Sequence, residues 1–318
     1  MTTHRQQHSA TWARYFADRG HGAARPLAAG VEGAVYRLGD GTVAKVWTGR
    51  RPADPDLVRR VYDDIARHAA SLPFATPEIL AVEEHEGVLV TYERELAGAP
   101  LRADSAVVAP PRELPGRETD ALLTVLRGLA AVPGTEAMRR LTVQGDDRPL
   151  WEGHARFPDA LAALVRRAVR RHGDLLAARI PGLAAVVRRT VESLVALPDG
   201  PFVSVVHGDL VPPNIHVDDT GAPTAVLDFG FFTTAGDPAF EAAVTAAVWD
   251  MYGPYAEPHT STLTRLFAER LHHSPHTLAL YQRAYALATY DLFSSDGSDG
   301  HFRWCARLLG RGPLTPPR

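Results

Sequence analysis

The sequence has little of several residue types, and each shortage excludes a class of protein. Cys305 is the only cysteine among 318 residues, which excludes an internal disulfide and a cysteine-based metal cluster. The net charge is -3 and the chain has no basic run that would follow a phosphate backbone, so a nucleic-acid partner is not expected. No stretch approaches the roughly 20 apolar residues of a membrane span, and residues 1–11 contain no apolar signal segment. These absences predict a cytoplasmic protein that binds no membrane.

Two further shortages point to particular positions. Lysine and arginine together number 34, yet Lys45 is the only lysine, and Asn214 is the only asparagine. We infer a G+C-rich coding background that replaces Lys by Arg, and Asn by other residues, wherever the chemistry tolerates it. Arginine does not replace a compact point charge, and Asp or Gln cannot always replace asparagine at a metal. Both residues are therefore candidate site residues.

The first hundred residues predict a small antiparallel sheet with one helix. Apolar alternation on both sides of a Gly-Asp-Gly turn predicts a β-hairpin over residues 34–38 and 42–47. A helix is expected over residues 56–70, followed by strands over 78–83 and 88–93. The next segment is rich in Ala, Pro and Arg and is typical of a linker, over residues 97–115.

The rest of the chain is predominantly helical in pattern. Two short apolar strands, residues 202–206 and 224–227, interrupt the helices, and polar residues follow each of them. We therefore predict an α+β protein with two lobes, a β-rich one over residues 1–96 and a helical one over 97–318. The five expected helices span residues 119–132, 157–171, 182–197, 238–252 and 275–293.

The segment V-V-H-G-D-L-V-P-P-N-I-H-V, residues 205–217, carries the strongest chemical signal. A strand leads into His207-Gly208-Asp209, Asn214 follows five residues after the aspartate, and Asp228 ends the second strand in V-L-D-F-G. Phosphoryl transfer requires a carboxylate that orients the incoming hydroxyl and hard oxygen ligands that hold Mg²⁺ on the phosphates. Asp209 suits the first role, and Asn214 with Asp228 suits the second. An Asp-x4-Asn spacing alone would be explained by a turn, but its pairing with Asp-Phe-Gly is much more specific.

A glycine turn upstream suits phosphate binding. Gly30 and Gly33 lie in G-V-E-G-A-V-Y, where backbone amides would approach phosphates. Lys45 follows in V-A-K-V-W, where a strand lysine reaches the α- and β-phosphates. The glycine turn alone is a weak signal, and its position before Lys45 strengthens it.

With these motifs in order, the chain resembles the aminoglycoside phosphotransferase family, within the wider protein-kinase-like fold. The resemblance implies that Asp209 is the catalytic base, Asn214 and Asp228 bind Mg²⁺, and Lys45 holds the phosphates of ATP or GTP. It also implies a hinge after residues 90–93, where backbone groups near Arg94 and Leu96 would hold the base of the nucleotide. The motifs that carry it are His207-Gly208-Asp209 with Asn214, Asp228-Phe229-Gly230, Gly236-Asp237-Pro238-Ala239 and the hairpin over residues 30–45.

Several positions depart from the family pattern. The family has a glutamate on the first-lobe helix that pairs with the lysine, whereas residues 56–70 offer only aspartates, with Asp63 or Asp64 best spaced. Glu241 stands where the family has an aspartate, and we expect it to be structural, with Asp237 as the N-cap of its helix. His207 is expected to support the loop by hydrogen bonding. His216 is expected to be a packed core histidine.

The acceptor is expected to be a small molecule with a hydroxyl group. Asp228 to Asp237 is too short for an activation segment that docks a peptide, which argues against a protein kinase. Aminoglycosides, peptide antibiotics and macrolides, in a resistance or self-protection role, stay open beside choline-like, homoserine-like and sugar alcohols. A regulatory pseudokinase is the alternative from another class, although no expected site residue is missing.

The C-terminal region offers both charges and rings for an acceptor. Its carboxylates would attract a cationic aminoglycoside, but arginines are interleaved with them, and its aromatic residues are expected to be core at helical spacing. The carboxylates are Asp250, Glu257, Asp291, Asp296 and Asp299; the arginines are Arg265, Arg270, Arg283, Arg303 and Arg307; the aromatic residues are Trp249, Tyr252, Tyr255, Tyr281, Tyr285 and Tyr290.

Overall fold

The computed structural model describes residues 11–310 apart from 31, 50, 53, 103–110, 199, 201 and 295. The chain divides into two compact units. The N-terminal unit comprises residues 1–67 and 75–97, and the C-terminal unit comprises residues 68–74 and 98–318. No helix in the part of the chain that the structure describes is long and apolar enough to cross a membrane.

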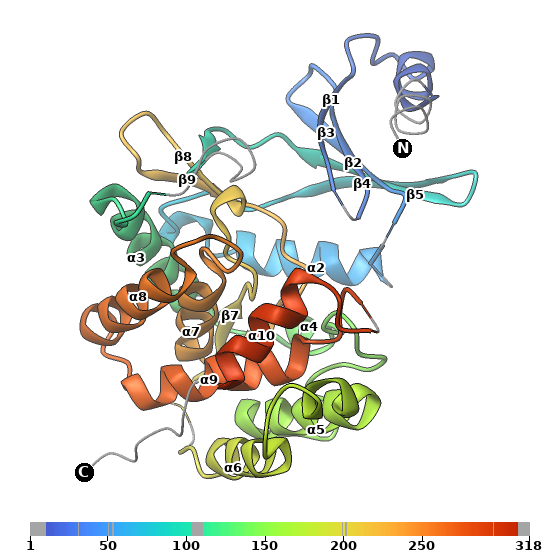
Figure 1. Cartoon of the computed structure of the whole chain (residues 1–318). Helices are drawn as coiled ribbons and strands as arrows, with labels where there is room; N and C mark the ends of the chain where they lie inside the picture. Colours follow the sequence, from blue (N-terminus) through green and yellow to red (C-terminus); the bar gives the residue numbers. More distant parts are fainter. Residues whose placement is uncertain are drawn as a thin grey trace. The chain divides into compact units, whose positions relative to one another are not determined.

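The N-terminal unit is built on a five-stranded antiparallel sheet in the order β1-β2-β3-β5-β4 (Figure 1). The predicted hairpin and the two later strands are confirmed. β1 was not predicted, because all five of its residues are exposed and its sequence has no apolar alternation. The strands are β1 Arg25–Ala29, β2 Ala34–Arg37, β3 Thr42–Trp47, β4 Ile79–His85 and β5 Val88–Arg94.

Two helices accompany this sheet. A helix over residues 11–18 places Trp12, Tyr15 and Phe16 in one core cluster with inward-facing sheet residues such as Tyr36 and Val90. Helix α2, Pro55–Ala66, begins at the N-cap Asp54, whose carboxylate accepts a hydrogen bond from the Leu57 amide at 2.9 Å. It ends four residues before the predicted end.

The C-terminal unit consists mainly of helices, and α7 and α9 lie at its centre. Ten of the eleven residues of α7 and ten of the fifteen of α9 are buried, and each helix begins with a capped N-terminus followed by proline. All five predicted helices are present, with bounds that differ by several residues. They are α3 Gly116–Ala131, α5 Phe157–Ala177, α6 Leu183–Val195, α7 Pro238–Val248 and α9 Pro275–Thr289.

Three further helices of this unit were not predicted. They are α4 Glu136–Arg139, α8 Ala256–Arg270 and α10 Gly300–Gly310. α8 buries His259 and Thr260 alongside apolar side chains, so the apolar pattern of its sequence is weak. α10 starts at the end of the Ser/Asp/Gly-rich segment at residues 294–300, which is a poor helix signal.

Short strands of the C-terminal unit carry the segments that sequence analysis singled out. β7, Ser204–Val206, pairs with β10, Thr234–Gly236, and both strands are fully buried. A second sheet joins β6, Ala99–Pro100, to β8, Ile215–Val217, and β8 to β9, Pro223–Val226. The ends of β7 and β9 therefore deliver His207-Gly208-Asp209 and Asp228 to loops of the same unit.

Candidate active site

The loop after β7 is closed by hydrogen bonds between its own residues. The side-chain amide of Asn214 donates to the Asp209 carbonyl at 2.9 Å, and the Val211 amide donates to the same carbonyl at 2.8 Å. The Leu227 amide in turn donates to the Asn214 carbonyl at 2.8 Å. The five-residue spacing of the motif thus places Asn214 beside Asp209 and links both to the end of β9.

Gly208 is required by the packing of this loop. Its φ is +76°, and a Cβ atom there would lie 2.5 Å from the Phe232 Cβ and 2.8 Å from the Phe232 carbonyl oxygen. No side chain fits that space without moving the backbone. The contact explains why glycine, and not the arginine typical of protein kinases, separates His207 from Asp209.

His207 connects the two strand ends. The side chain is fully buried, and burial lowers its pKa to about 4, so the ring is neutral at neutral pH. Its Nδ1 accepts a hydrogen bond from the Asp209 amide at 3.2 Å, so Nε2 carries the proton and donates to the Leu227 carbonyl at 2.7 Å. The predicted hydrogen-bonding role of His207 is confirmed.

Asp228 follows β9 in an unusual backbone conformation. Its φ is +65°, a region that aspartate tolerates better than most residues but that costs on the order of 1–3 kcal/mol. Asp228 is exposed, whereas the next residue, Phe229, is buried with its ring centroid 4.5 Å from that of His207. The packing of Phe229 on His207 helps to hold this conformation.

Glu241 on α7 holds the loop after β7 in place by hydrogen bonds. One carboxylate oxygen, Oε2, accepts hydrogen bonds from the amides of His207 at 2.6 Å and Gly208 at 2.9 Å, and Oε1 accepts from the Thr245 hydroxyl at 3.2 Å. The residue is 2% exposed, and burial raises its pKa to about 7 despite the three donors. Sequence analysis placed Glu241 correctly as structural but missed its partner. The signal in the sequence that could have revealed this contact is a single acidic residue in the otherwise apolar helix α7.

Asp237 is confirmed as the N-cap of α7. Its carboxylate accepts from the Ala239 amide at 2.8 Å and from the Tyr281 hydroxyl at 2.7 Å. It therefore joins the start of α7 to α9. His216 is half-buried on β8, as expected of a packed histidine.

In the N-terminal unit, Gly30 and Gly33 form the turn between β1 and β2. The Gly30 amide donates to the Gly33 carbonyl at 2.8 Å, and the Glu32 carbonyl accepts from the Gly49 amide at 2.9 Å. A Cβ atom on Gly33 would lie 1.8 Å from the Val46 carbonyl oxygen, so only glycine allows the turn to approach β3 this closely.

Lys45 on β3 points to this turn. Its Nζ lies 2.7 Å from Glu32 Oε2 and 4.0 Å from the centroid of the Trp47 ring, and its side chain is 14% exposed. The family pattern predicted a carboxylate partner for Lys45 on α2, with Asp63 or Asp64 best spaced. Glu32 in the glycine turn forms an ion pair with Lys45, and Asp64 pairs with Arg67.

Of the two predicted hinge residues, Arg94 ends β5 and Leu96 follows it. The Arg94 amide donates to the Glu78 carbonyl at 3.1 Å, and its Nε lies 2.6 Å from Glu78 Oε2. The amide of Arg94 is thus engaged inside the N-terminal unit. Leu96 lies beyond the strand and is half-buried. Because the Arg94 amide already has a partner, Leu96 is the better candidate for a main-chain contact to the nucleotide base.

The donor set near the loop suits one kind of metal. Among the described residues there is no group of three or more His, Cys, Asp or Glu side chains that could hold a metal ion. Asp228 offers a carboxylate, and Asn214, whose amide nitrogen is engaged, offers Oδ1. Two hard oxygen donors fit Mg²⁺, which takes its other ligands from phosphates and water.

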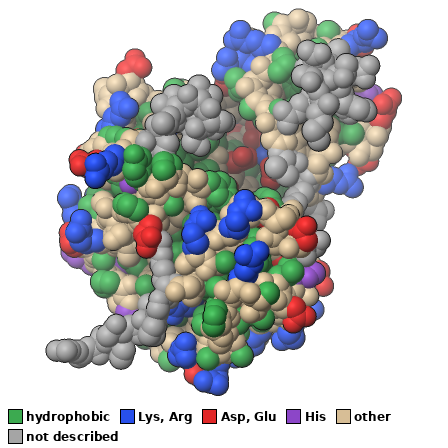
Figure 2. Space-filling view, in the orientation of Figure 1, with side chains coloured by type: hydrophobic (Ala, Val, Ile, Leu, Met, Phe, Trp, Pro, Cys, Tyr) green, Lys and Arg blue, Asp and Glu red, His purple; other side chains and the backbone are tan. Residues whose placement is uncertain are grey.

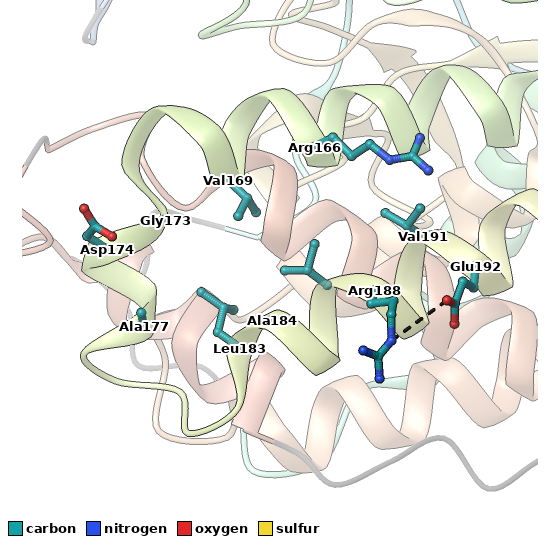
Figure 3. Close-up of a pocket in the computed structure, with 11 residues that line it drawn as sticks. Arg166, Val169, Gly173, Asp174, Ala177, Leu183, Ala184, Arg188, Val191 and Glu192 are labelled. Carbon is teal, nitrogen blue, oxygen red and sulfur yellow. Dashed lines mark ion pairs between the residues drawn. The ribbon is translucent and has the colours of Figure 1, made fainter.

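A pocket of about 590 Å³ elsewhere in the C-terminal unit contains none of these residues. It lies between α5 and α6 and is lined by apolar side chains such as Val169 and Val191, with Arg188 and Glu192 paired at its rim (Figure 3). Its lining also includes the carboxylate of Asp174. The candidate residues Asp209 and Asp228 lie outside this pocket, on the loops after β7 and β9.

Comparison with known proteins agrees with this geometry. The profile of APH, the phosphotransferase enzyme family, matches residues 23–290. No curated protein matches the chain.

Several solved structures share the fold. The macrolide 2'-phosphotransferase MphH from Brachybacterium faecium is 20% identical, with a TM-score of 0.54, covering 91% of this chain and 93% of that one. A macrolide 2'-phosphotransferase type I is also 20% identical, with a TM-score of 0.58 and coverage of 98% and 99%. The aminoglycoside phosphotransferase APH(3'')-Id from Streptomyces rimosus, in complex with ADP and streptomycin, is 18% identical, with a TM-score of 0.52 and coverage of 96% and 98%. The predicted α+β, protein-kinase-like fold is confirmed.

The buried carboxyl of Glu241 predicts a specific pH dependence of stability. Its pKa is about 7 in the folded protein and near 4.5 for an exposed glutamate in the unfolded chain, so it contributes stability below pH 4.5 that is lost as the pH rises through 7. The loss is on the order of 3 kcal/mol. In Glu241→Gln, the part of the unfolding free energy that depends on the titration of Glu241 should vanish. The titration of His207 contributes equally in wild type and in the variant, so it cancels when the two proteins are compared. Unfolding free energies from pH 4.5 to 8 that run parallel in the two proteins would contradict the assignment.

Proposed function

The chain belongs to the phosphotransferase enzyme family, and on that premise we propose that it transfers the γ-phosphoryl group of Mg-ATP or Mg-GTP to a hydroxyl of a small molecule. The observation that carries the proposal is the joined loop pair in the C-terminal unit. His207 bonds both the Asp209 amide and the Leu227 carbonyl, so a base and a metal ligand sit on one hydrogen-bonded frame. Such preorganisation is what phosphoryl transfer demands of a protein.

Asp209 is the general base in this proposal. Its carboxylate orients the acceptor hydroxyl and accepts its proton while the oxygen bonds to the γ-phosphorus and the bond to the leaving nucleoside diphosphate breaks. Asn214 and Asp228 hold Mg²⁺, which supplies charge neutralisation on the phosphates. The half-buried position of Asp209 beside Asn214 suits this role.

The N-terminal unit binds the nucleotide in this proposal. Backbone amides of the turn at Gly30 and Gly33 approach the phosphates, Lys45 contacts them, and the main chain near Leu96 holds the base. Lys45 reaches a phosphate only if it shares or gives up its ion pair with Glu32. Glu32 therefore competes with nucleotide for the one lysine of the chain. We place the reaction in the cytoplasm, where Mg-ATP is available.

The acceptor is a small molecule and not a peptide in this proposal. Only three residues lie between Gly230 and β10, and β10 pairs with β7 in the buried sheet. α7 begins directly after, at Pro238. This segment leaves no length for a loop that docks a peptide substrate.

Nucleotide binding tests the role of Lys45. Mg-ATP or Mg-GTP should raise Tm, because a ligand that binds only the folded state adds stability by mass action. Lys45→Ala should reduce this shift, and Glu32→Gln should enlarge it, since the competing carboxylate is lost. Glu84→Gln, on β4 of the same sheet, is the matched control and should behave as wild type. Equal shifts in wild type and Lys45→Ala would remove Lys45 from the phosphate site.

Substitution of the two proposed metal ligands should reduce turnover to different extents. Asp228→Ala should abolish turnover, whereas Asn214→Ala should be milder and partly restored by higher Mg²⁺, because water replaces a neutral ligand. Asp228→Asn keeps the shape and tolerates the positive φ, so it separates loss of charge from loss of the backbone conformation. Asp218→Ala in the exposed turn after β8 is the control. Full activity in Asp228→Ala would refute the metal site.

The base assignment is tested by Asp209→Asn. A positioned general base contributes about 10²- to 10⁴-fold, so kcat should fall within that range in this nearly isosteric variant. Nucleotide-induced Tm shifts should persist, because the phosphates and metal are held by other residues. Loss of nucleotide binding together with turnover would instead identify Asp209 as a metal ligand or a structural residue. A regulatory pseudokinase would show no acceptor phosphorylation in either protein.

A further inference from the structure

Three aromatic side chains of the C-terminal unit form a surface beside the candidate active site. Phe231 lies three residues after Asp228, and its ring stacks on Phe293 at 6.1 Å and an interplanar angle of 14°. Phe293 is 46% exposed and Tyr252 is 59% exposed, so the expectation that Tyr252 belongs to the core was wrong. We call Phe231, Phe293 and Tyr252 the aromatic face.

His301 at the start of α10 joins the members of this face. Its ring packs edge-on against Phe293 at 5.1 Å, and its Nδ1 lies 3.3 Å from the Tyr252 hydroxyl. His301 is 3% exposed, and its Nε2 lies 3.1 Å from the Thr289 hydroxyl. The rings are thus held by a buried histidine, which limits their freedom before any ligand binds.

Tyr252 lies at the other end of the aromatic face from Phe231, whose neighbour Phe232 packs against Gly208 in the loop after β7. Its hydroxyl is turned inward onto His301 while the ring stays exposed. Burial of the hydroxyl raises the pKa of Tyr252 to about 12, and the negative charge of Asp209 contributes to the rise. The Phe231 end of the aromatic face is one residue away from the contact between Phe232 and Gly208, and Gly208 directly precedes Asp209.

The carboxylates of this region are engaged in other contacts. Asp250 lies 3.0 Å from His259 Nδ1, and Asp291 lies 3.6 Å from Arg171 Nε. Asp299 accepts from the Phe302 amide at the start of α10. Asp296 likewise accepts from Ser294 and Ser298. Asp250 and Asp291 are thus buried in ion pairs, and Asp296 and Asp299 accept hydrogen bonds from their own loop or helix, so each of these carboxylates has a partner inside the unit.

Positive charge lies next to the aromatic face. Arg303 and Arg307 are exposed on α10, and a Cβ atom on Gly300 would lie 3.7 Å from the Tyr252 ring and 3.9 Å from Arg303. Figure 2 shows blue side chains over the surface where Figure 1 places α10. A polycation approaching this side of Asp209 would meet like charge, which is unfavourable.

We propose that the acceptor is a hydroxyl compound with an extended apolar face and at most one positive charge, which packs against Phe231, Phe293 and Tyr252. The inference rests on the proposed phosphotransfer at Asp209. Exposed aromatic rings contribute most binding free energy when an apolar ligand removes them from water. Because these rings are already held in place, little conformational entropy is lost on binding. A polycationic aminoglycoside is disfavoured, since the carboxylates it would need are engaged and arginines flank the rings.

Acceptor phosphorylation by Phe293→Ala tests the proposal, with erythromycin, a macrolide, as the apolar probe and kanamycin as the polycationic probe. We expect transfer of one phosphate to erythromycin by mass, a kcat/KM for kanamycin at least about tenfold lower, and a KM for erythromycin raised about 10- to 100-fold in Phe293→Ala. kcat should change little, because the ring is not part of the reacting groups. Phe293→Leu should recover part of the affinity. Phe202→Ala, 55% exposed ahead of β7, is the matched control and should leave KM unchanged.

The other outcomes overturn separate statements. Better turnover of kanamycin, or of a small alcohol such as choline, would overturn the acceptor class while the proposed phosphotransfer stands. An unchanged KM in Phe293→Ala would remove the aromatic face from the acceptor site. Absence of transfer to any hydroxyl compound of a broad panel, with the nucleotide-induced Tm shift intact, would overturn the proposed function and this inference with it.

Discussion

The carboxylate of Glu241 is the contact on which the loop after β7 depends. It accepts the amides of His207 and Gly208 in the buried interior, where no water would otherwise satisfy them. Those two bonds set the direction in which the chain leaves β7. The same turn brings Gly208 so close to Phe232 that a side chain is excluded. A single acid on a buried helix thus determines both the path of the loop and the residue type at its sharpest point.

His207 extends this constraint from one loop to the next. Because its pKa is lowered to about 4 by burial, it stays neutral and keeps one donor and one acceptor nitrogen. Each nitrogen serves a different strand end, one at Asp209 and one at Leu227. The main chain at Asp209 and at the residue before Asp228 is therefore held by hydrogen bonds to one histidine ring. Positioning of this kind through main-chain bonds is what electrostatic preorganisation requires of a site.

The two units engage charge in different ways. In the N-terminal unit the one lysine pairs with Glu32 of the glycine turn, so binding of an anion there must compete with an existing ion pair. In the C-terminal unit most acids around the aromatic face are paired or capping, and the exposed charges of α10 are positive. The choice of ligand in this protein would then depend on which charged side chains already have partners as much as on which charged side chains are present.

Local pattern in the sequence determined the hairpin over β2 and β3, the long helices, and the candidate residues Lys45, Asp209, Asn214 and Asp228. Those features depend on periodicity and on spacings of a few residues, which a chain carries without tertiary structure. Tertiary structure alone decided that β1 joins the sheet, that Glu241 holds a loop 34 residues earlier, and that Lys45 pairs with Glu32. It also decided that Tyr252 is exposed beside Phe293, because α7 ends just before it and α10 packs close by. Such contacts join residues far apart in sequence, and their energies depend on burial that only the folded chain creates.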